Sequence, residues 1–244
     1  MEFSKYNALG NNFIFMDNRD RRIDVSQETF VVRLCEPRTG IGADGLVEIG
    51  GRCAVKFAIQ LGLASADEDV TFCAYDGEHV GRVDSQSGLV HLKMKDIDRG
   101  IDRVVNNNYQ IFTGTLTLVA YFDDLESIDV QQDGDELRKI YDTGHKQGFV
   151  KAYVQTCPEK TSEISMRSYE CGVNGETLAC GTGAALVTVS RGSAFTEPTS
   201  VKVNVRVRLG TLTVTALRVG EREFSDVYLI GPACHMFEGV LRDL

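Results

Sequence analysis

The sequence lacks any long apolar run. No stretch of the 244 residues approaches the ~20 consecutive apolar residues that a helix needs to cross a bilayer. The first residues, Met1 to Lys5, include a glutamate and no apolar core, so we expect no secretory signal peptide. We therefore expect a cytoplasmic protein without a membrane partner.

Positive charge is also in short supply. Lysine and arginine number 26 against 35 aspartates and glutamates, which leaves a net charge of −9. Proteins that bind nucleic acids or anionic membranes need basic surfaces to offset phosphate charge. The balance therefore argues against both kinds of partner, although it does not identify a substrate.

Paired cysteines and clustered histidines are missing as well. The seven cysteines are an odd number without a Cys-x-x-Cys spacing, and the four histidines are scattered. A zinc site or a disulfide framework would need closer and paired spacing. The pattern predicts free thiols in a reducing compartment and no metal site.

The most informative stretch that is present runs from Glu170 to Ala184. It has the pattern of a strand end, a polar turn and a cysteine, Cys180, that opens a helix of small apolar residues. Glycines after the cysteine permit a tight turn and close approach of a ligand. We expect the donors at this helix start to bind a carboxylate or phosphate. They are the backbone amides of Gly181, Thr182 and Gly183.

The same turn bears on the chemistry of Cys180. A cysteine at a helix start gains thiolate character from the local field, which makes it a candidate catalytic group. The alternative is a small core residue at a point of close helix packing. From this turn alone both interpretations stay open.

The rest of the chain has the pattern of a duplicated α/β unit. Each half contains short alternating strands, an apolar helix preceded by glycine, and hairpins. In the first half the helix is expected over residues 52–61. The run 97–108, with three consecutive asparagines, is the expected crossover between the halves.

Several motifs stand in one order along the chain and together carry a resemblance. They are Gly10-Asn11-Asn12-Phe13, Arg38-Thr39-Gly40-Ile41-Gly42-Ala43-Asp44-Gly45, Gly51-Arg52-Cys53, Tyr169-Glu170, Glu176-Thr177-Leu178-Ala179-Cys180-Gly181-Thr182-Gly183, and Gly231-Pro232-Ala233 with Phe237-Glu238-Gly239. In this order they resemble the diaminopimelate epimerase family, cofactor-independent amino-acid epimerases of lysine biosynthesis. The resemblance covers most of the chain.

The resemblance implies an α/β (α+β) fold with two pseudo-symmetric domains. Each would be a curved, barrel-like sheet around a central helix, with the site in the cleft between them. We expect residues 1–108, completed by a C-terminal strand in 232–244, to form one domain and residues 109–231 the other. The resemblance also implies a homodimer.

The resemblance further implies a two-base reaction on an amino-acid substrate. The reaction would belong to the biosynthesis of lysine and peptidoglycan precursors. One cysteine removes the Cα proton as a thiolate and a second delivers a proton to the opposite face, without pyridoxal phosphate or a metal. Cys180 would be one of the two, and the helix amides would hold the α-carboxylate. Asn11 and Glu170 are expected to contact substrate. Otherwise Asn11 would be a turn residue with positive φ, and Glu170 would hold the strand end.

The chain departs from the family pattern at the other cysteine. In the family that residue lies in a Met-Cys-Gly-Asn-Gly segment, but here residues 46–49 lead directly into Gly50-Gly51-Arg52-Cys53. Cys53 matches a later, non-catalytic cysteine of the family. Thr117, Ala152 and Cys171 also replace family residues, respectively a histidine, an asparagine and a basic residue.

Two explanations for the absent segment remain open: an incomplete sequence that omits a mobile active-site loop, or a divergent member with a broken acid/base pair. Two other functions also remain open. One is a related isomerase of the proline racemase or phenazine-biosynthesis type. The other is a non-catalytic protein that binds an amino acid or a protein partner.

Overall fold

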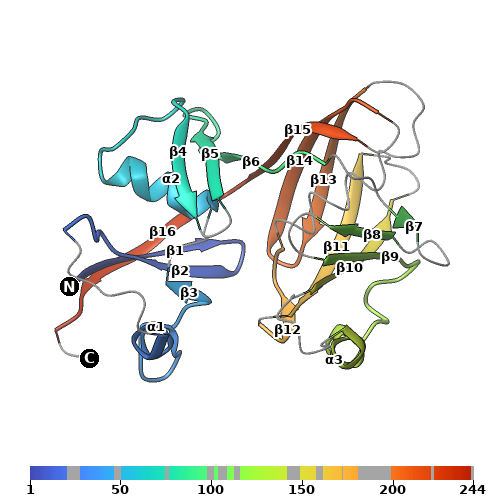
Figure 1. Cartoon of the computed structure of the whole chain (residues 1–244), viewed down its shortest axis with the longest axis horizontal. Coiled ribbons are helices and arrows are strands. Elements are labelled where there is room, and N and C mark those ends of the chain that lie inside the picture. The colour runs from blue at the N-terminus through green and yellow to red at the C-terminus, as the bar shows by residue number, and fades with distance from the viewer. Residues whose placement is uncertain are drawn as a thin grey trace. The chain divides into compact units, whose positions relative to one another are not determined.

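The computed structural model describes most of the chain. The described residues are 1–20, 28–46, 51–74, 77–97, 102–103, 109–112, 116–141, 149–157, 162–171, 173–180, 199–220 and 223–242. The fold is mixed α and β, with two compact units (Figure 1). Unit 1 is Met1–Leu92 with Gly231–Leu244, and unit 2 is Lys93–Ile230. In the described part of the chain, no helix is long and apolar enough to cross a membrane.

The first sheet of unit 1 joins the two ends of the chain, as Figure 1 shows for the blue and red strands. Its strand order is β16-β1-β2-β3. The bounds are Glu2–Ala8 for β1, Asn11–Phe15 for β2, Gly45–Leu46 for β3 and Cys234–Val240 for β16. Leu9 and Gly10 have positive φ, as the two-residue turn of a hairpin requires. Asn11 is not among the positive-φ residues, so its alternative role as a positive-φ turn residue is wrong.

Helix α2 packs against the strands of unit 1. The remaining elements of the unit are α1 (Glu28–Cys35), α2 (Gly51–Gln60), β4 (Val70–Ala74), β5 (Gly77–Val83) and β6 (Val90–Lys93), the last of which ends at the unit boundary. Helix α2 confirms the helix expected over 52–61. Its Val55 lies so close to β5 that a Cβ on Gly81 would be 2.7 Å from Val55 Cγ2. The buried core includes Tyr6, Phe15, Cys53 and Val55.

Unit 2 is built on a larger sheet. Its strand order is β15-β14-β13-β11-β10-β9-β8-β7, with β12 beside β11. The bounds are β7 Asp102–Arg103, β8 Tyr109–Phe112, β9 Leu116–Tyr121, β10 Phe149–Thr156, β11 Glu163–Glu170, β12 Gly175–Thr177, β13 Ser200–Val207, β14 Gly210–Arg218 and β15 Phe224–Gly231. The pairs β9/β10 and β11/β13 are parallel. The pairs β7/β8, β8/β9, β10/β11, β11/β12, β13/β14 and β14/β15 are antiparallel.

Helix α3 (Val130–Tyr141) covers one face of this sheet. It packs on Tyr153 and Tyr169, and a Cβ on Gly134 would lie 2.1 Å from Tyr169 Cδ2. The tyrosine hydroxyls donate hydrogen bonds to Asp133 (2.5 Å) and Asp135 (2.8 Å) of the helix. The apolar rings and their polar tips therefore fix α3 on the sheet. The helix expected to begin at Cys180 lies outside the described residues.

The division between the units differs from the one expected at 108/109. It falls between Leu92 and Lys93, because the chain beyond β6 pairs with β15 of unit 2. Met94 donates a backbone hydrogen bond to Val227 O (2.8 Å), and Ile97 forms an antiparallel bridge with Phe224. The asparagine run gave no sign of this pairing, which joins residues far apart in the sequence.

Candidate functional site

The face of the unit 2 sheet opposite α3 carries a set of buried polar side chains. Tyr153 and Tyr169 point toward α3, so their neighbours along β10 and β11 point to the other face. Residues paired across neighbouring strands share a face. Two rows result, namely Thr117-Val150-Glu170 and Val119-Ala152-Ser168-Thr177.

A chain of hydrogen bonds on this face ends at Glu170. Thr177 Oγ1 donates to Glu170 Oε1 at 2.6 Å, and Ser168 Oγ lies 2.9 Å from Thr177 Oγ1. A hydroxyl has one proton to donate, so Ser168 must donate to Thr177. The chain therefore delivers a fixed donor to the Glu170 carboxylate and holds it in one orientation.

Cys180 follows this network by three residues. Strand β12 runs antiparallel to β11, with Gly175 opposite Glu170 and Thr177 opposite Ser168, so the chain leaves Thr177 in the direction away from the Glu170 end of β11. Ala179 is 1% exposed and Cys180 is 4% exposed. Burial alone is compatible with both a catalytic thiol and a core residue. Gly181, Thr182 and Gly183, expected to bind a carboxylate, lie outside the described residues.

Two of the three substituted family positions, Thr117 and Ala152, lie on the same face of the sheet as Glu170, whereas Cys171 packs on the α3 side. Thr117 and Ala152 have no exposed surface. Thr117 lies in one row with Glu170, two strand spacings away, or about 10 Å. Among the described residues nothing accepts or donates a hydrogen bond at Thr117 Oγ1. Cys171 directly follows Glu170 and is half-buried. The structure thus brings Thr117 and Ala152 to the face of the sheet that carries Glu170.

An ion pair on the α3 side fastens β12 to β11. Arg167 binds Glu176 through two bonds, Nε to Oε1 (2.7 Å) and Nη2 to Oε2 (2.8 Å). Its Nη1 donates to the carbonyls of Leu125 (2.6 Å) and Ile128 (3.0 Å). This ion pair was not among the features predicted from the sequence. The alternation of β11 could have shown that Arg167 shares a face with Tyr169 rather than with Glu170.

This ion pair predicts a pH dependence of stability. Hydrogen bonding to Arg167 lowers the pKa of the Glu176 carboxyl below its ordinary value. A lowered folded-state pKa stabilises the protein above the unfolded pKa of about 4.3, and this contribution is lost as the pH falls through the folded value. We expect Glu176→Gln to be less stable than the unmodified chain at pH 7 and to show a smaller loss of stability between pH 7 and pH 3.5.

Urea unfolding at the two pH values measures this effect. Glu136→Gln, on the exposed side of α3, is the matched control and should retain the full pH dependence. An unchanged pH dependence in Glu176→Gln would show that the Arg167 pair does not contribute.

Three polar residues organise the expected site region of unit 1. Asn12 N donates to Asp44 Oδ2 (2.6 Å), and Asp44 N donates to Asn12 O (2.8 Å). Lys5 Nζ donates to the carbonyl of Gly42. These bonds fasten the glycine-rich loop to the first hairpin. Asn11, expected to contact substrate, begins β2 beside this loop and is half-buried.

Cys53, in the first turn of α2, is a core residue. It is wholly buried, and burial raises the pKa of its thiol to about 12. At neutral pH Cys53 is therefore held as a thiol. Cys53 therefore cannot take the place of a thiolate base.

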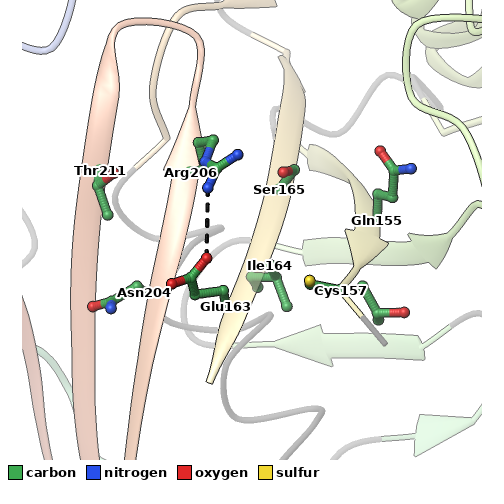
Figure 2. Close-up of a pocket in the computed structure, with 9 residues that line it drawn as sticks. Gln155, Cys157, Glu163, Ile164, Ser165, Asn204, Arg206 and Thr211 are labelled. Carbon is green, nitrogen blue, oxygen red and sulfur yellow. Dashed lines mark hydrogen bonds and ion pairs between the residues drawn. The ribbon is translucent and has the colours of Figure 1, made fainter. Parts of the chain in front are cut away.

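Unit 2 also has an open hollow of about 420 Å³. The residues that line it are Gln155, Thr156, Cys157, Glu163, Ile164, Ser165, Asn204, Arg206 and Thr211, and Figure 2 shows most of them. It lies at the end of β11 away from Glu170, roughly 20 Å along the strand. Glu163 and Arg206 form its ion pair at 3.5 Å, with the Arg206 side chain 70% exposed. Such an exposed pair contributes little, and none of the expected site residues lines the hollow.

Solved structures identify the fold. The chain superposes on a probable proline racemase from Agrobacterium radiobacter K84, solved with bound carbonate, with a TM-score of 0.67 and 11% identity, covering 99% of this chain and 92% of that one. A phenazine biosynthesis protein from Bacillus anthracis gives a TM-score of 0.65 at 14% identity, covering 99% of both chains. The protein therefore has the two-unit α+β fold of these proteins.

Sequence relatives identify the family within that fold. The chain is 30% identical to the diaminopimelate epimerase of Flavobacterium psychrophilum, over 98% of this chain and 99% of that protein. It is 32% identical to the enzyme named diaminopimelate epimerase in Chlorobaculum tepidum, over 96% and 98%. No protein-family model matches the chain. It belongs to the diaminopimelate epimerase family, whose members are cofactor-independent amino-acid epimerases.

The alignments also show that this chain lacks residues. The alignment with the Flavobacterium psychrophilum protein extends over 264 positions, whereas the chain has 244 residues. The alignment with the Chlorobaculum tepidum protein extends over 271 positions. The relatives therefore contain residues that have no counterpart here, which agrees with the absence of the Met-Cys-Gly-Asn-Gly segment.

Proposed function

We propose that this chain performs acid/base chemistry at the Cα of an amino acid of the diaminopimelate type, with Cys180 as the proton-transferring group. The observation that carries the proposal is the position of Cys180. It is nearly wholly buried, three residues beyond Thr177, whose hydroxyl holds the Glu170 carboxylate.

In the proposed reaction the Cys180 thiolate removes the Cα proton. The electron pair of the broken C–H bond remains on Cα and delocalises into the substrate carboxylate, while the sulfur becomes a thiol. The amides of Gly181, Thr182 and Gly183 would stabilise the charge that builds on that carboxylate. Glu170, oriented by Ser168 and Thr177, would accept a hydrogen bond from the substrate ammonium, and Asn11 would be a further substrate contact.

Inversion needs a second proton-transferring group on the opposite face of Cα. A single base returns its proton to the side from which the proton came. Epimerisation is reversible, so each group must act as a base in one direction and an acid in the other. Cys53 fails this requirement, because its pKa of about 12 keeps it a thiol. The 244-residue chain should therefore exchange the Cα hydrogen of one stereoisomer without rapid inversion.

Two other functions are supported by specific observations. The relatives contain residues that have no counterpart in this chain. Their absence here favours a protein that binds an amino acid, or a protein partner, without turnover. The fold shared with the racemase and phenazine-biosynthesis structures favours a related isomerase acting on a different substrate. The proposal also includes a homodimer in the cytoplasm, and seven free cysteines fit that reducing compartment.

Deuterium uptake distinguishes these functions. The purified protein is incubated in D₂O with LL- or meso-diaminopimelate, Cα deuteration is followed by proton NMR, and the stereoisomers are separated by chiral chromatography. We expect slow uptake into one stereoisomer without matching inversion, from a protein whose intact mass is 26.9 kDa. Rapid inversion at that mass would contradict the one-base reaction, and binding without any uptake would contradict catalysis.

A further inference from the structure

Arg52 in unit 1 is a buried charge without a partner in the described part of the chain. It is the second residue of α2 and is 6% exposed. Its Nη1 atom is fully buried and makes no hydrogen bond, and no described carboxylate forms an ion pair with it. Burial lowers the pKa of the guanidinium, yet an arginine does not lose its proton in a protein.

A buried charge of this kind requires an opposite charge. Removing an ion from water is strongly unfavourable unless pairing and hydrogen bonds offset the loss of hydration. The chain has 35 acidic residues, and the fold does pair a buried guanidinium elsewhere. Arg167, 9% exposed, makes two bonds to Glu176 and two to backbone carbonyls. Among the described residues Arg52 has no such set, which leaves its charge open to a partner from outside the chain.

The surroundings of Arg52 suit an anion. The first turn of α2 contains no acidic residue, so no carboxylate of that turn offsets the positive end of the helix dipole. Gly51, the first residue of the helix, is packed closely by Leu92, since a Cβ on Gly51 would lie 2.6 Å from Leu92 Cδ2, so an anion would have to approach from another side of the helix start. The guanidinium and the helix start thus place two sources of positive potential in one turn. A planar guanidinium pairs most strongly with a carboxylate through two parallel hydrogen bonds.

We propose that Arg52 binds a carboxylate group of a small-molecule ligand, and so positions that ligand in unit 1. The inference rests on the proposed function in one respect, since it takes the carboxylate to be that of the amino-acid substrate. It assigns the recognition of that carboxylate to Arg52, in the first turn of α2.

Thermal unfolding with Arg52→Met tests the proposal. The probes are meso-diaminopimelate and sodium malonate, each compared with sodium chloride at equal ionic strength. At a hundredfold excess over Kd, a carboxylate should raise the Tm of the unmodified chain by roughly 5–10 °C. Arg52→Met should lose this rise. Without carboxylate it should be at least as stable as the unmodified chain, because an apolar side chain replaces an unpaired charge.

Arg206→Met is the matched control, since Arg206 is an exposed arginine in unit 2. It should keep the full carboxylate-dependent rise in Tm. If Arg52→Met does not fold, Arg52→Lys keeps the charge but loses the paired geometry, and carboxylate binding should weaken about 10- to 100-fold. Unchanged binding in Arg52→Lys would overturn the proposal.

Two further outcomes would overturn it. In the first, Arg52→Met has a lower Tm than the unmodified chain in carboxylate-free buffer, and carboxylate does not change the Tm of the unmodified chain. This result would show that Arg52 has a partner within the protein. The other is Cα deuterium uptake by Arg52→Met with an unchanged KM, which would leave the proposed function intact. Arg52-dependent carboxylate binding without any Cα uptake by the unmodified chain would instead support the inference and remove the proposed catalysis.

Discussion

Replacing Cys180 by alanine is expected to lower the rate of Cα deuterium uptake by at least about 100-fold, since acid/base groups typically contribute 10²- to 10⁴-fold. The thiol is the group proposed to take the proton, and alanine has none to offer. Serine should fail as well, because its hydroxyl is a far weaker acid than a thiol and provides almost no anion at neutral pH. Proton NMR in D₂O measures the loss directly.

The control for this substitution is Cys157→Ser. Cys157 is a half-buried cysteine of unit 2. It lines the open hollow of that unit, away from Glu170. It should leave deuterium uptake unchanged. Urea unfolding of both variants separates loss of chemistry from loss of fold. Uptake that persists in a folded Cys180→Ala protein would return Cys180 to the role of a buried core residue.

Inserting Met-Cys-Gly-Asn-Gly between Gly50 and Gly51 is expected to give the chain inversion activity. The segment supplies a second cysteine before α2, and with it a group for the opposite face of Cα. A proton donor of this kind contributes about 100-fold or more to a rate. The rate should remain limited by Thr117, Ala152 and Cys171, which replace polar or basic residues of the family near Glu170.

The control carries Met-Ser-Gly-Asn-Gly at the same place, so that the length is restored without the thiol. Chiral chromatography should show the second stereoisomer for the cysteine insertion and little of it for the serine insertion. Equal inversion by both would show that connection length, rather than the second acid/base group, limits this chain. No inversion by either, with deuterium uptake intact, would contradict the prediction by showing that the inserted cysteine does not supply the second proton-transferring group.

Features that depend on neighbouring residues could be predicted from the sequence. The prediction of a helix over residues 52–61 was correct, because the apolar spacing and the flanking glycines are local signals. The family followed from motifs that stand in order along the chain, and relatives that match nearly the full chain confirmed it. The absence of a Met-Cys-Gly-Asn-Gly segment was equally visible in the sequence.

Features that join distant residues were decided by the tertiary structure. The row that places Thr117 with Glu170 depends on strand register, which no local pattern specifies. The division at 92/93 depends on pairing between Ile97 and Phe224, and the Arg167–Glu176 pair depends on which face of β11 each side chain takes. Packing buries Arg52 without a partner among the described residues. No local pattern specifies this, because burial is set by the elements that fold over a residue rather than by its neighbours in the chain.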